Sequence, residues 1–465
     1  MPSQLRSSVK LLSVILAFLA TGCLSKQKDP VTLRVDSEIR HQTIEGWSAT
    51  VWEIGIPADA WRKDPTAERY DQLVIGDPVP EWLKAKIMDA AVSELGLNRF
   101  RLEIGPQVAL PDGNDRPGNI HKETYRFKWQ DFIIMNWLLP LKQRIEQRGE
   151  KMVLYISYDL GSKLTPSWLL QPEEYAKMAI GTLEHLKKAH DLEPDYWTVL
   201  NEPGNNRPGS PEVVAQLIAT TGRRIKKAGF RTRMAGPEVV TPGEIPAYLK
   251  ALEETPDVLP QLGQLTYHLY GGPKNISHRN EIRDWAKRLG ITTAQTEWFE
   301  GKGLGAVEAL YLDLTEANVS AWEQYGLCWM ANSYNRGGGG DYFVIQPDYS
   351  GYEMNINSWY LRQFMKYVRP GDVRVGISSP EKTIKPVAFV KPDGRQVVVV
   401  INSGSTAETI HIRDLAAGAY EVILTDAHTK GRLLPQQSIV AGQTLIFNLA
   451  ARGVVTFHGI SRVSS

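Results

Sequence analysis

The stretch Tyr-Trp-Thr-Val-Leu-Asn-Glu-Pro at residues 196–203 organises the rest of the chain. Its first five residues are aromatic, β-branched or apolar and carry no charge, which predicts a short strand covered on both faces. Asn201 and Glu202 follow that strand, and Pro203 stops it because proline lacks the N–H that a sheet ladder needs. A carboxylate at the carboxyl end of a parallel strand lies where barrels and open sheets carry their active sites. A surface loop acid beside a strand end is the alternative interpretation.

A second stretch has the same form. Residues 291–298, Ile-Thr-Thr-Ala-Gln-Thr-Glu-Trp, are a β-prone run that ends on Glu297 and is followed by an aromatic residue. Enough chain separates Glu297 from Glu202 for three strand–helix units. Glycosidic cleavage requires two carboxylates that face each other across a sugar. One protonates the leaving oxygen and the other attacks the anomeric carbon or activates water. The pair therefore predicts a glycosidase.

Eight β-rich runs alternate with amphipathic helical stretches in the middle of the chain. The runs lie near residues 43–48, 98–104, 152–158, 196–201, 231–236, 265–270, 292–297 and 326–331. Alternation of strand and helix predicts a parallel sheet. Eight units in about 320 residues predict a (β/α)8 TIM barrel of the α/β class. A doubly wound open sheet is the alternative, and it is disfavoured because no Gly-x-Gly-x-x-Gly motif follows any of the runs. In this numbering Glu202 ends strand four and Glu297 ends strand seven.

From residue 373 onward the pattern changes. Short alternating runs follow one another, separated by turn signals such as Pro-Asp-Gly at 392–394. Such runs predict a C-terminal β-sandwich of roughly 90 residues. Residues 31–40, near the other end of the chain, also alternate apolar and polar side chains, as a half-buried strand does.

Three further motifs accompany the two glutamate stretches. They are His-Gln-Thr-Ile-Glu-Gly-Trp at 41–47, Leu-Asn-Arg-Phe-Arg at 97–101 and Phe-Met-Lys-Tyr-Val-Arg-Pro-Gly at 364–371. Together the motifs resemble the retaining glycoside hydrolases of clan A, and in particular glycoside hydrolase family 30, the glucosylceramidase, β-1,6-glucanase and glucuronoxylanase group. The resemblance covers roughly residues 31–460. Families 39 and 5 are alternatives, since the whole clan shares the Asn-Glu-Pro motif.

The resemblance implies a mechanism and a domain organisation. Glu202 would be the acid/base and Glu297 the nucleophile of a secreted β-glycosidase that works by double displacement and needs no cofactor. Asn201 would bond the 2-hydroxyl of the sugar, a contact that can strengthen in the transition state. The strand at 31–40 would join 369–462 in the β-sandwich, which leaves 41–368 as the catalytic barrel.

Other strand ends supply candidate substrate-binding residues. Arg101 could hydrogen-bond the nucleophile and hold it ionised, with a structural ion pair as the alternative. His268 and Tyr270 share a face by strand alternation, and the resemblance implies that a side chain at this place contacts the nucleophile or the sugar. A satisfied core histidine is the alternative for His268. Flat rings on which a sugar could stack are predicted at the ends of the last and first barrel strands, at Trp329 and Trp47.

The first 30 residues have the composition of a bacterial signal peptide and tether. Arg6 and Lys10 precede an apolar stretch at 11–19 that is too short for an ordinary membrane span. Ala-Thr-Gly-Cys at 20–23 then resembles a lipobox, in which Cys23 becomes acylated. An ordinary secretory signal is the alternative. We expect an outer-membrane lipoprotein, or a periplasmic or secreted protein, that touches the membrane only through this anchor.

The charge balance and the cysteine count narrow the choice of partners. The formal net charge is +1, which argues against nucleic acid and against a highly charged substrate. With Cys23 acylated, Cys328 is alone, so no disulfide framework is expected. No metal site is expected either, because His185 and His190 are five positions apart on a polar helix and do not share a face. We expect a monomer that acts on β-glucan or xylan.

Two alternative functions stay open. The first is a non-catalytic glycan-binding surface lipoprotein that kept the barrel, which would bind glycans without turnover. The second is an exo-acting enzyme of the β-xylosidase type, which the size of the released products would separate from an endo-acting one.

Overall fold

The computed structural model describes residues 29–51, 79–105, 127–159, 170–205, 209–330 and 340–462. The predicted signal peptide and the lipidation site Cys23 lie outside the described residues. Within the described part, none of the helices combines the length and the apolar character that a membrane crossing needs.

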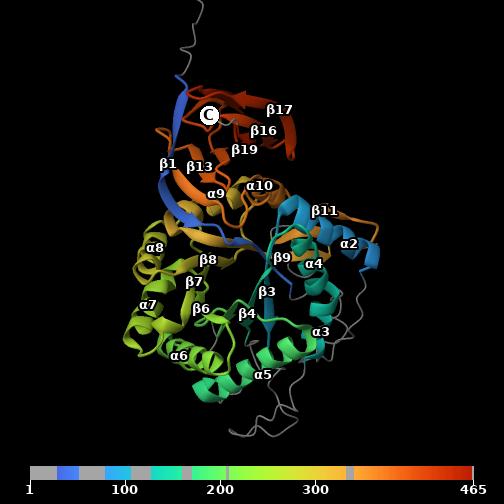
Figure 1. Ribbon diagram of the computed structural model, residues 1–465, viewed down its shortest axis with the longest axis vertical. Helices are drawn as coiled ribbons and strands as arrows, with labels where there is room; N and C mark the ends of the chain where they lie inside the picture. The colour runs from blue at the N-terminus through green and yellow to red at the C-terminus, as the bar shows by residue number, and fades with distance from the viewer. Residues whose placement is uncertain are drawn as a thin grey trace, which may run out of the picture.

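Eight parallel strands close into a barrel (Figure 1). In order they are β2 (Gly46–Thr50), β3 (Arg99–Ile104), β4 (Val153–Tyr158), β5 (Tyr196–Thr198), β6 (Arg233–Val239), β7 (Leu262–His268), β8 (Thr292–Glu297) and β9 (Val319–Met330). Each strand pairs in parallel with the next, and β9 pairs with both β8 and β2, which closes the ring. The predicted TIM barrel is confirmed. Two short strands, β10 (Asp341–Ile345) and β11 (Tyr352–Met354), extend the sheet beyond β9.

The eighth barrel strand differs from its predicted position. It begins at Val319, whereas the sequence placed it near residue 326. The stretch before 326 contains the polar residues Glu323 and Gln324. Both side chains are nevertheless buried, and that of Glu323 accepts hydrogen bonds from Thr50 and Tyr155 inside the barrel.

Helices follow the strands and surround the barrel (Figure 1). They are α2 (Glu81–Ala90), α3 (Lys128–Ile133), α4 (Leu139–Gln147), α5 (Pro172–His190), α6 (Pro211–Lys227), α7 (Ile245–Glu254), α8 (Ser277–Leu289), α9 (Leu304–Leu312) and α10 (Ile356–Met365). Helix α6 shows why a helix begins at this point of the sequence. Ser210 caps it by accepting a hydrogen bond from the N–H of Val213 at 3.4 Å, and a proline follows at the first position. Its apolar face, with Leu217 and Ile218, is fully buried.

A second sheet combines the start of the chain with its end. Its order is β17-β16-β19-β14-β13-β12-β1-β15-β18. The strands are β1 (Val31–Thr43), β12 (Val373–Ser378), β13 (Ile384–Val390), β14 (Gln396–Asn402), β15 (Glu408–Arg413), β16 (Gly418–Thr425), β17 (Arg432–Ile439), β18 (Leu445–Leu449) and β19 (Val454–Arg462). Strand β1 pairs with β12 and β15, and its pairing with β12 continues to Thr43, beyond the expected end at residue 40.

Strand β14 shows how the two domains are joined. All of its residues, Gln-Val-Val-Val-Val-Ile-Asn, are buried. Val398 and Val400 belong to the core of the sandwich, whereas Val397, Val399 and Ile401 belong to the cluster that continues into the barrel. Because side chains alternate across a strand, one strand contributes to both cores. The sandwich is therefore packed firmly against the barrel, with α10 contacting β16 and β19 between them.

Candidate active site

Two glutamates lie at the carboxyl ends of barrel strands. Glu202 comes shortly after β5, and Glu297 is the last residue of β8. Both are buried, with 7% of each residue exposed. One carboxylate oxygen of each and a ring nitrogen of His268 all lie within 4.8 Å of one another. The fold therefore brings together the two carboxylates that the sequence singled out.

Arg101, on β3, is fully buried and binds several groups of the site at once. One guanidinium nitrogen donates to Oε2 of Glu297, and another donates to Oδ1 of Asn201 at 2.6 Å. The same side chain forms an ion pair with Glu103 at 3.1 Å. Burial alone would lower the pKa of Arg101, but Glu103 and then Glu238 raise it well above its ordinary value. Arg101 thus combines the predicted contact to Glu297 with the structural ion pair of the alternative.

The second oxygen of Glu297 is held by Tyr270. The phenol donates to Oε1 of Glu297 at 2.7 Å. Burial, followed by the charge of Glu297, raises the pKa of Tyr270 well above its ordinary value, so the phenol keeps its proton. With Arg101 on one oxygen and Tyr270 on the other, the carboxylate of Glu297 has a fixed orientation at the mouth of the barrel.

His268, the last residue of β7, lies among three carboxylates. Its Nδ1 is 3.0 Å from Oε1 of Glu202 and 3.8 Å from Oε2 of Glu297, and its Nε2 is 3.7 Å from Glu238. Burial alone would lower the pKa of His268, but the three glutamates raise it to about 10. The ring is therefore charged at neutral pH and donates to Glu202. It also makes an edge contact with Tyr270, at 6.1 Å between ring centroids, so the two rings do lie on one face.

Glu238, on β6, is a fully buried acid that the sequence analysis missed. Its Oε2 accepts a hydrogen bond from Ser157 at 2.7 Å. Burial alone would raise the pKa of Glu238, but Arg101 and then His268 lower it below its ordinary value. The sequence signal was present, since an acid directly after a β-rich run had selected Glu202. The predicted fifth run simply ended too early, before Pro237.

The backbone at Glu202 and Glu238 is strained. Their φ angles are +49° and +57°, in the left-handed region that residues other than glycine rarely adopt. The N–H of Glu202 donates to the carbonyl of Glu238 at 3.1 Å, which ties the two strained positions together. Such backbone costs on the order of 1–3 kcal/mol per residue and clusters at functional sites.

Two more neighbours of the site were missed. Glu323, on β9, accepts hydrogen bonds from Thr50 at 2.5 Å and from Tyr155 at 3.2 Å. Burial raises the pKa of Glu323 to about 8. Asn205 donates to Oε2 of Glu202 at 3.0 Å. An earlier start of the eighth strand would have pointed to Glu323, whereas nothing in the sequence marks Asn205.

The two tryptophans predicted to lie under the sugar have different positions. Trp329 is half-buried near the carboxyl end of β9, at the same end of the barrel as the two glutamates. Trp47 is fully buried, and its indole N–H donates to the carbonyl of Val368 at 2.7 Å. On the same strand Thr50 reaches Glu323 inside the barrel. Trp47 therefore faces the surrounding helices by alternation, and the prediction that its ring stacks on a sugar is wrong.

Glu202, His268 and Glu297 are also close enough together to be considered as metal ligands. Their environment disfavours that role. Arg101 already occupies Oε2 of Glu297, and His268, charged at neutral pH, would repel a cation. The arrangement suits a pair of positioned carboxylates that exchange protons with a substrate.

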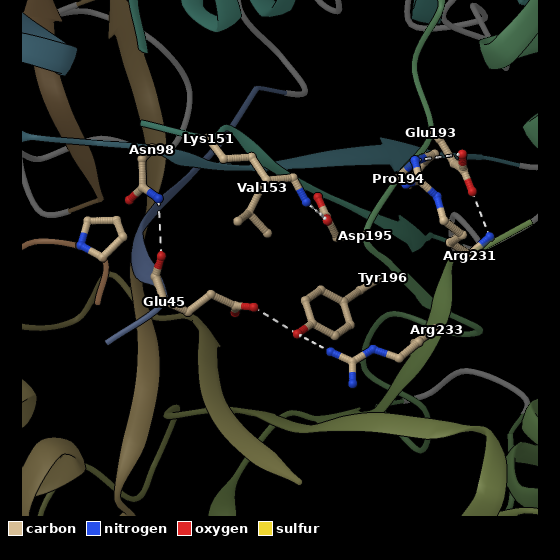
Figure 2. Close-up of a pocket in the computed structure, with 11 residues that line it drawn as sticks. Glu45, Asn98, Lys151, Val153, Glu193, Pro194, Asp195, Tyr196, Arg231 and Arg233 are labelled. Atoms are coloured by element: carbon tan, nitrogen blue, oxygen red, sulfur yellow. Dashed lines mark hydrogen bonds and ion pairs between the residues drawn. The ribbon is translucent and has the colours of Figure 1, made fainter. Parts of the chain in front are cut away.

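A cavity of about 560 Å³ lies at the opposite end of the barrel, where the strands begin (Figure 2). Two ion pairs lie in its wall, Lys151 with Asp195 and Arg231 with Glu193, and Arg233 donates to the hydroxyl of Tyr196, which in turn donates to Glu45. Because each of these charges has its own partner in the wall, the cavity suits a structural role, which is usual for this face of a barrel.

Residues 371–457 match the family model described as the glycosyl hydrolase family 30 beta sandwich domain. Solved structures are similar over nearly the whole chain. The catalytic domain of a GH30 xylanase C from Talaromyces cellulolyticus has 18% identity and a TM-score of 0.69, over 92% of this chain and 100% of that one. A conserved exported protein from Bacteroides fragilis has 16% identity and a TM-score of 0.70, over 92% and 99%. An endo-β1,6-glucanase has 16% identity and a TM-score of 0.65, over 92% and 95%. These likenesses show a shared fold, a barrel with an attached β-sandwich.

Proposed function

The chain is glycoside hydrolase family 30-like, and from this premise we propose that it is a retaining β-glycosidase acting on β-linked polysaccharide or oligosaccharide. One observation carries the proposal: an oxygen of Glu202 lies within 4.8 Å of an oxygen of Glu297 at the carboxyl end of the barrel. Carboxyl groups about 5–5.5 Å apart belong to retaining enzymes, and about 6.5–9.5 Å to inverting ones. The short separation supports retention.

In the first step Glu297 attacks the anomeric carbon while Glu202 protonates the leaving oxygen. Arg101 and Tyr270 hold the two oxygens of Glu297, so the nucleophile needs no reorientation before it attacks. The guanidinium of Arg101 also forms an ion pair with Glu297.

In the second step Glu202 removes a proton from water, and the water displaces Glu297 from the sugar. His268 lies 3.0 Å from Glu202 and 3.8 Å from Glu297, so the same ring helps to hold both carboxylates in place through the two steps.

The substrate that we propose is a neutral β-glucan or xylan. Among the described residues of the site, the cations Arg101 and His268 are both engaged by glutamates, which disfavours binding of a uronic acid. We also propose that the protein is a monomer exported by its first 30 residues and anchored through Cys23.

The test is sugar release from a panel of β-glucans, xylans and aryl β-glycosides by the parent and by Glu297→Ala. We expect release by the parent and a loss on the order of 10⁴-fold or more in the variant, because the nucleophile is gone. NMR of the first product should show the β-anomer.

Release that survives Glu297→Ala, or an α-anomer as the first product, would contradict the mechanism. Glycan binding without turnover by the parent would instead favour the non-catalytic lipoprotein. Single sugars as the first products would indicate exo action.

A further inference from the structure

A second cluster of side chains that could bind a metal lies outside the barrel, between helix α3 and the C-terminal part of α5 (Figure 1). Oδ1 of Asp131, on α3, is 2.7 Å from Nε2 of His185 and 2.6 Å from Nε2 of His190, both on α5. All three atoms lie within 4.8 Å of one another. The sequence analysis expected no metal site here because the two histidines are five positions apart, yet their Nε2 atoms meet at one carboxylate oxygen.

The histidines meet because a different helix places a carboxylate between them. His190 is the last residue of α5, and Asp191 after it turns the chain with a left-handed φ of +50°. Phe127 stacks on His185 with ring centroids 3.8 Å apart. The two imidazoles contact each other edge to face at 5.8 Å. Packing thus orients both rings so that their Nε2 atoms point to one place.

We propose that Asp131, His185 and His190 bind one divalent transition-metal ion, and that zinc fits the donor set. Imidazole nitrogen and carboxylate oxygen are established zinc ligands, at about 2.0–2.2 Å, whereas calcium and magnesium prefer ligands that are all oxygen. The present N···O distances need only a small side-chain opening to admit the ion. The negative charge of Asp131 offsets part of the ion's charge.

The exposure of the cluster suits a site that is open to solvent. The side chains of Asp131 and His185 are 27% and 25% exposed, and that of His190 is 7% exposed. An ion can therefore enter from solvent, and water can complete a tetrahedral shell. Neither α3 nor α5 contributes a side chain to the Glu202–Glu297 pair, so the bound ion would tie two helices together and stabilise the folded chain.

Binding of zinc to the intact protein tests the proposal. Protein freed of metal with a chelator is titrated calorimetrically with zinc sulfate at pH 7.5, and in parallel with calcium chloride. We expect one zinc ion and no calcium ion per chain, and a melting temperature that rises with zinc. The double variant His185→Gln/His190→Gln should lose at least tenfold in zinc affinity and the rise in melting temperature.

Two control variants separate this cluster from other ligands. Glu202→Gln removes a ligand from the trio in the barrel, and His278→Gln removes a histidine on α8. Both should keep the zinc affinity of the parent. If the double variant folds poorly, Asp131→Asn, which keeps the shape of the side chain, replaces it.

No zinc binding by the parent, or an affinity that survives loss of both histidines, would overturn the proposal and leave a hydrogen-bonded cluster. An affinity lost in Glu202→Gln would place the ion in the barrel instead and would equally overturn it.

Discussion

The two ends of the barrel hold charge in different ways. At the carboxyl ends of the strands, cations are shared: Arg101 binds Glu297 and Glu103, and His268 lies among three glutamates. At the amino ends, two ion pairs beside the cavity of Figure 2 each join one cation to one acid: Lys151 with Asp195 and Arg231 with Glu193. One-to-one pairing satisfies each charge and leaves nothing to react. At the carboxyl ends the acids outnumber the cations, so that two carboxylates stay available for proton transfer and nucleophilic attack.

The largest effect is expected from Glu202→Gln, which removes the proposed acid/base at the carboxyl end of the barrel. Polysaccharide hydrolysis should fall on the order of 10²–10⁴-fold, because the leaving oxygen receives no proton. A dinitrophenyl β-glycoside, whose leaving group needs no proton, should keep most of its rate of glycosyl-enzyme formation. Burst kinetics on both substrates measure this. Equal losses on the two would contradict the assigned role.

A second test exchanges the shared arginine. Arg101→Lys should lower kcat on the order of 10²-fold, because an ammonium group cannot reach Glu297 and Asn201 in the planar fork that the guanidinium provides. Steady-state kinetics measure the loss. Arg99→Lys is the matched control, since Arg99 lies on the same strand but pairs with Glu45 at the amino end. A similar drop in kcat for both variants would contradict the view that only the carboxyl end of the barrel serves catalysis.

The charge of His268 should appear in the stability of the protein. Its pKa is raised from the ordinary value near 6.5 to about 10 in the folded state. The contribution of His268 to the free energy of unfolding is therefore complete below pH 6.5. It is lost as pH rises toward 10, by up to about 1.4 kcal/mol per pH unit. Urea unfolding of the parent and of His268→Gln at pH 6.5, 8 and 9.5 should show the difference between them shrinking. A constant difference would mean that His268 is neutral.

The smallest expected effect on activity comes from the amino end. Glu45 accepts hydrogen bonds from Arg99, Gln264 and Tyr196. Glu45→Gln should lower the free energy of unfolding by about 1–3 kcal/mol, because Arg99 stays buried without its counter-charge. The value of kcat should remain within about twofold of the parent. Lost activity at unchanged stability would show that this end serves catalysis after all.

Much of the architecture could be predicted from local pattern. Uninterrupted β-prone runs, proline stops and amphipathic stretches between the runs are local signals, so the barrel and the positions of Glu202 and Glu297 followed from the sequence. The sandwich could be predicted from its period-two runs and turn residues. Each of these signals lies within one continuous segment of chain, over which backbone preference and burial pattern act together.

Other features depend on contacts between distant segments. The direction of Trp47 could not be predicted, because a strand buried on both faces shows no alternation to orient it. Glu238 and Glu323 belong to the site only because β6 and β9 lie near Arg101 in the closed barrel. His185 and His190 meet only through Asp131 on another helix. The sequence by itself determined which strands end in acids, and the tertiary structure decided which charges share a partner, since electrostatic interactions follow distance in space and not separation along the chain.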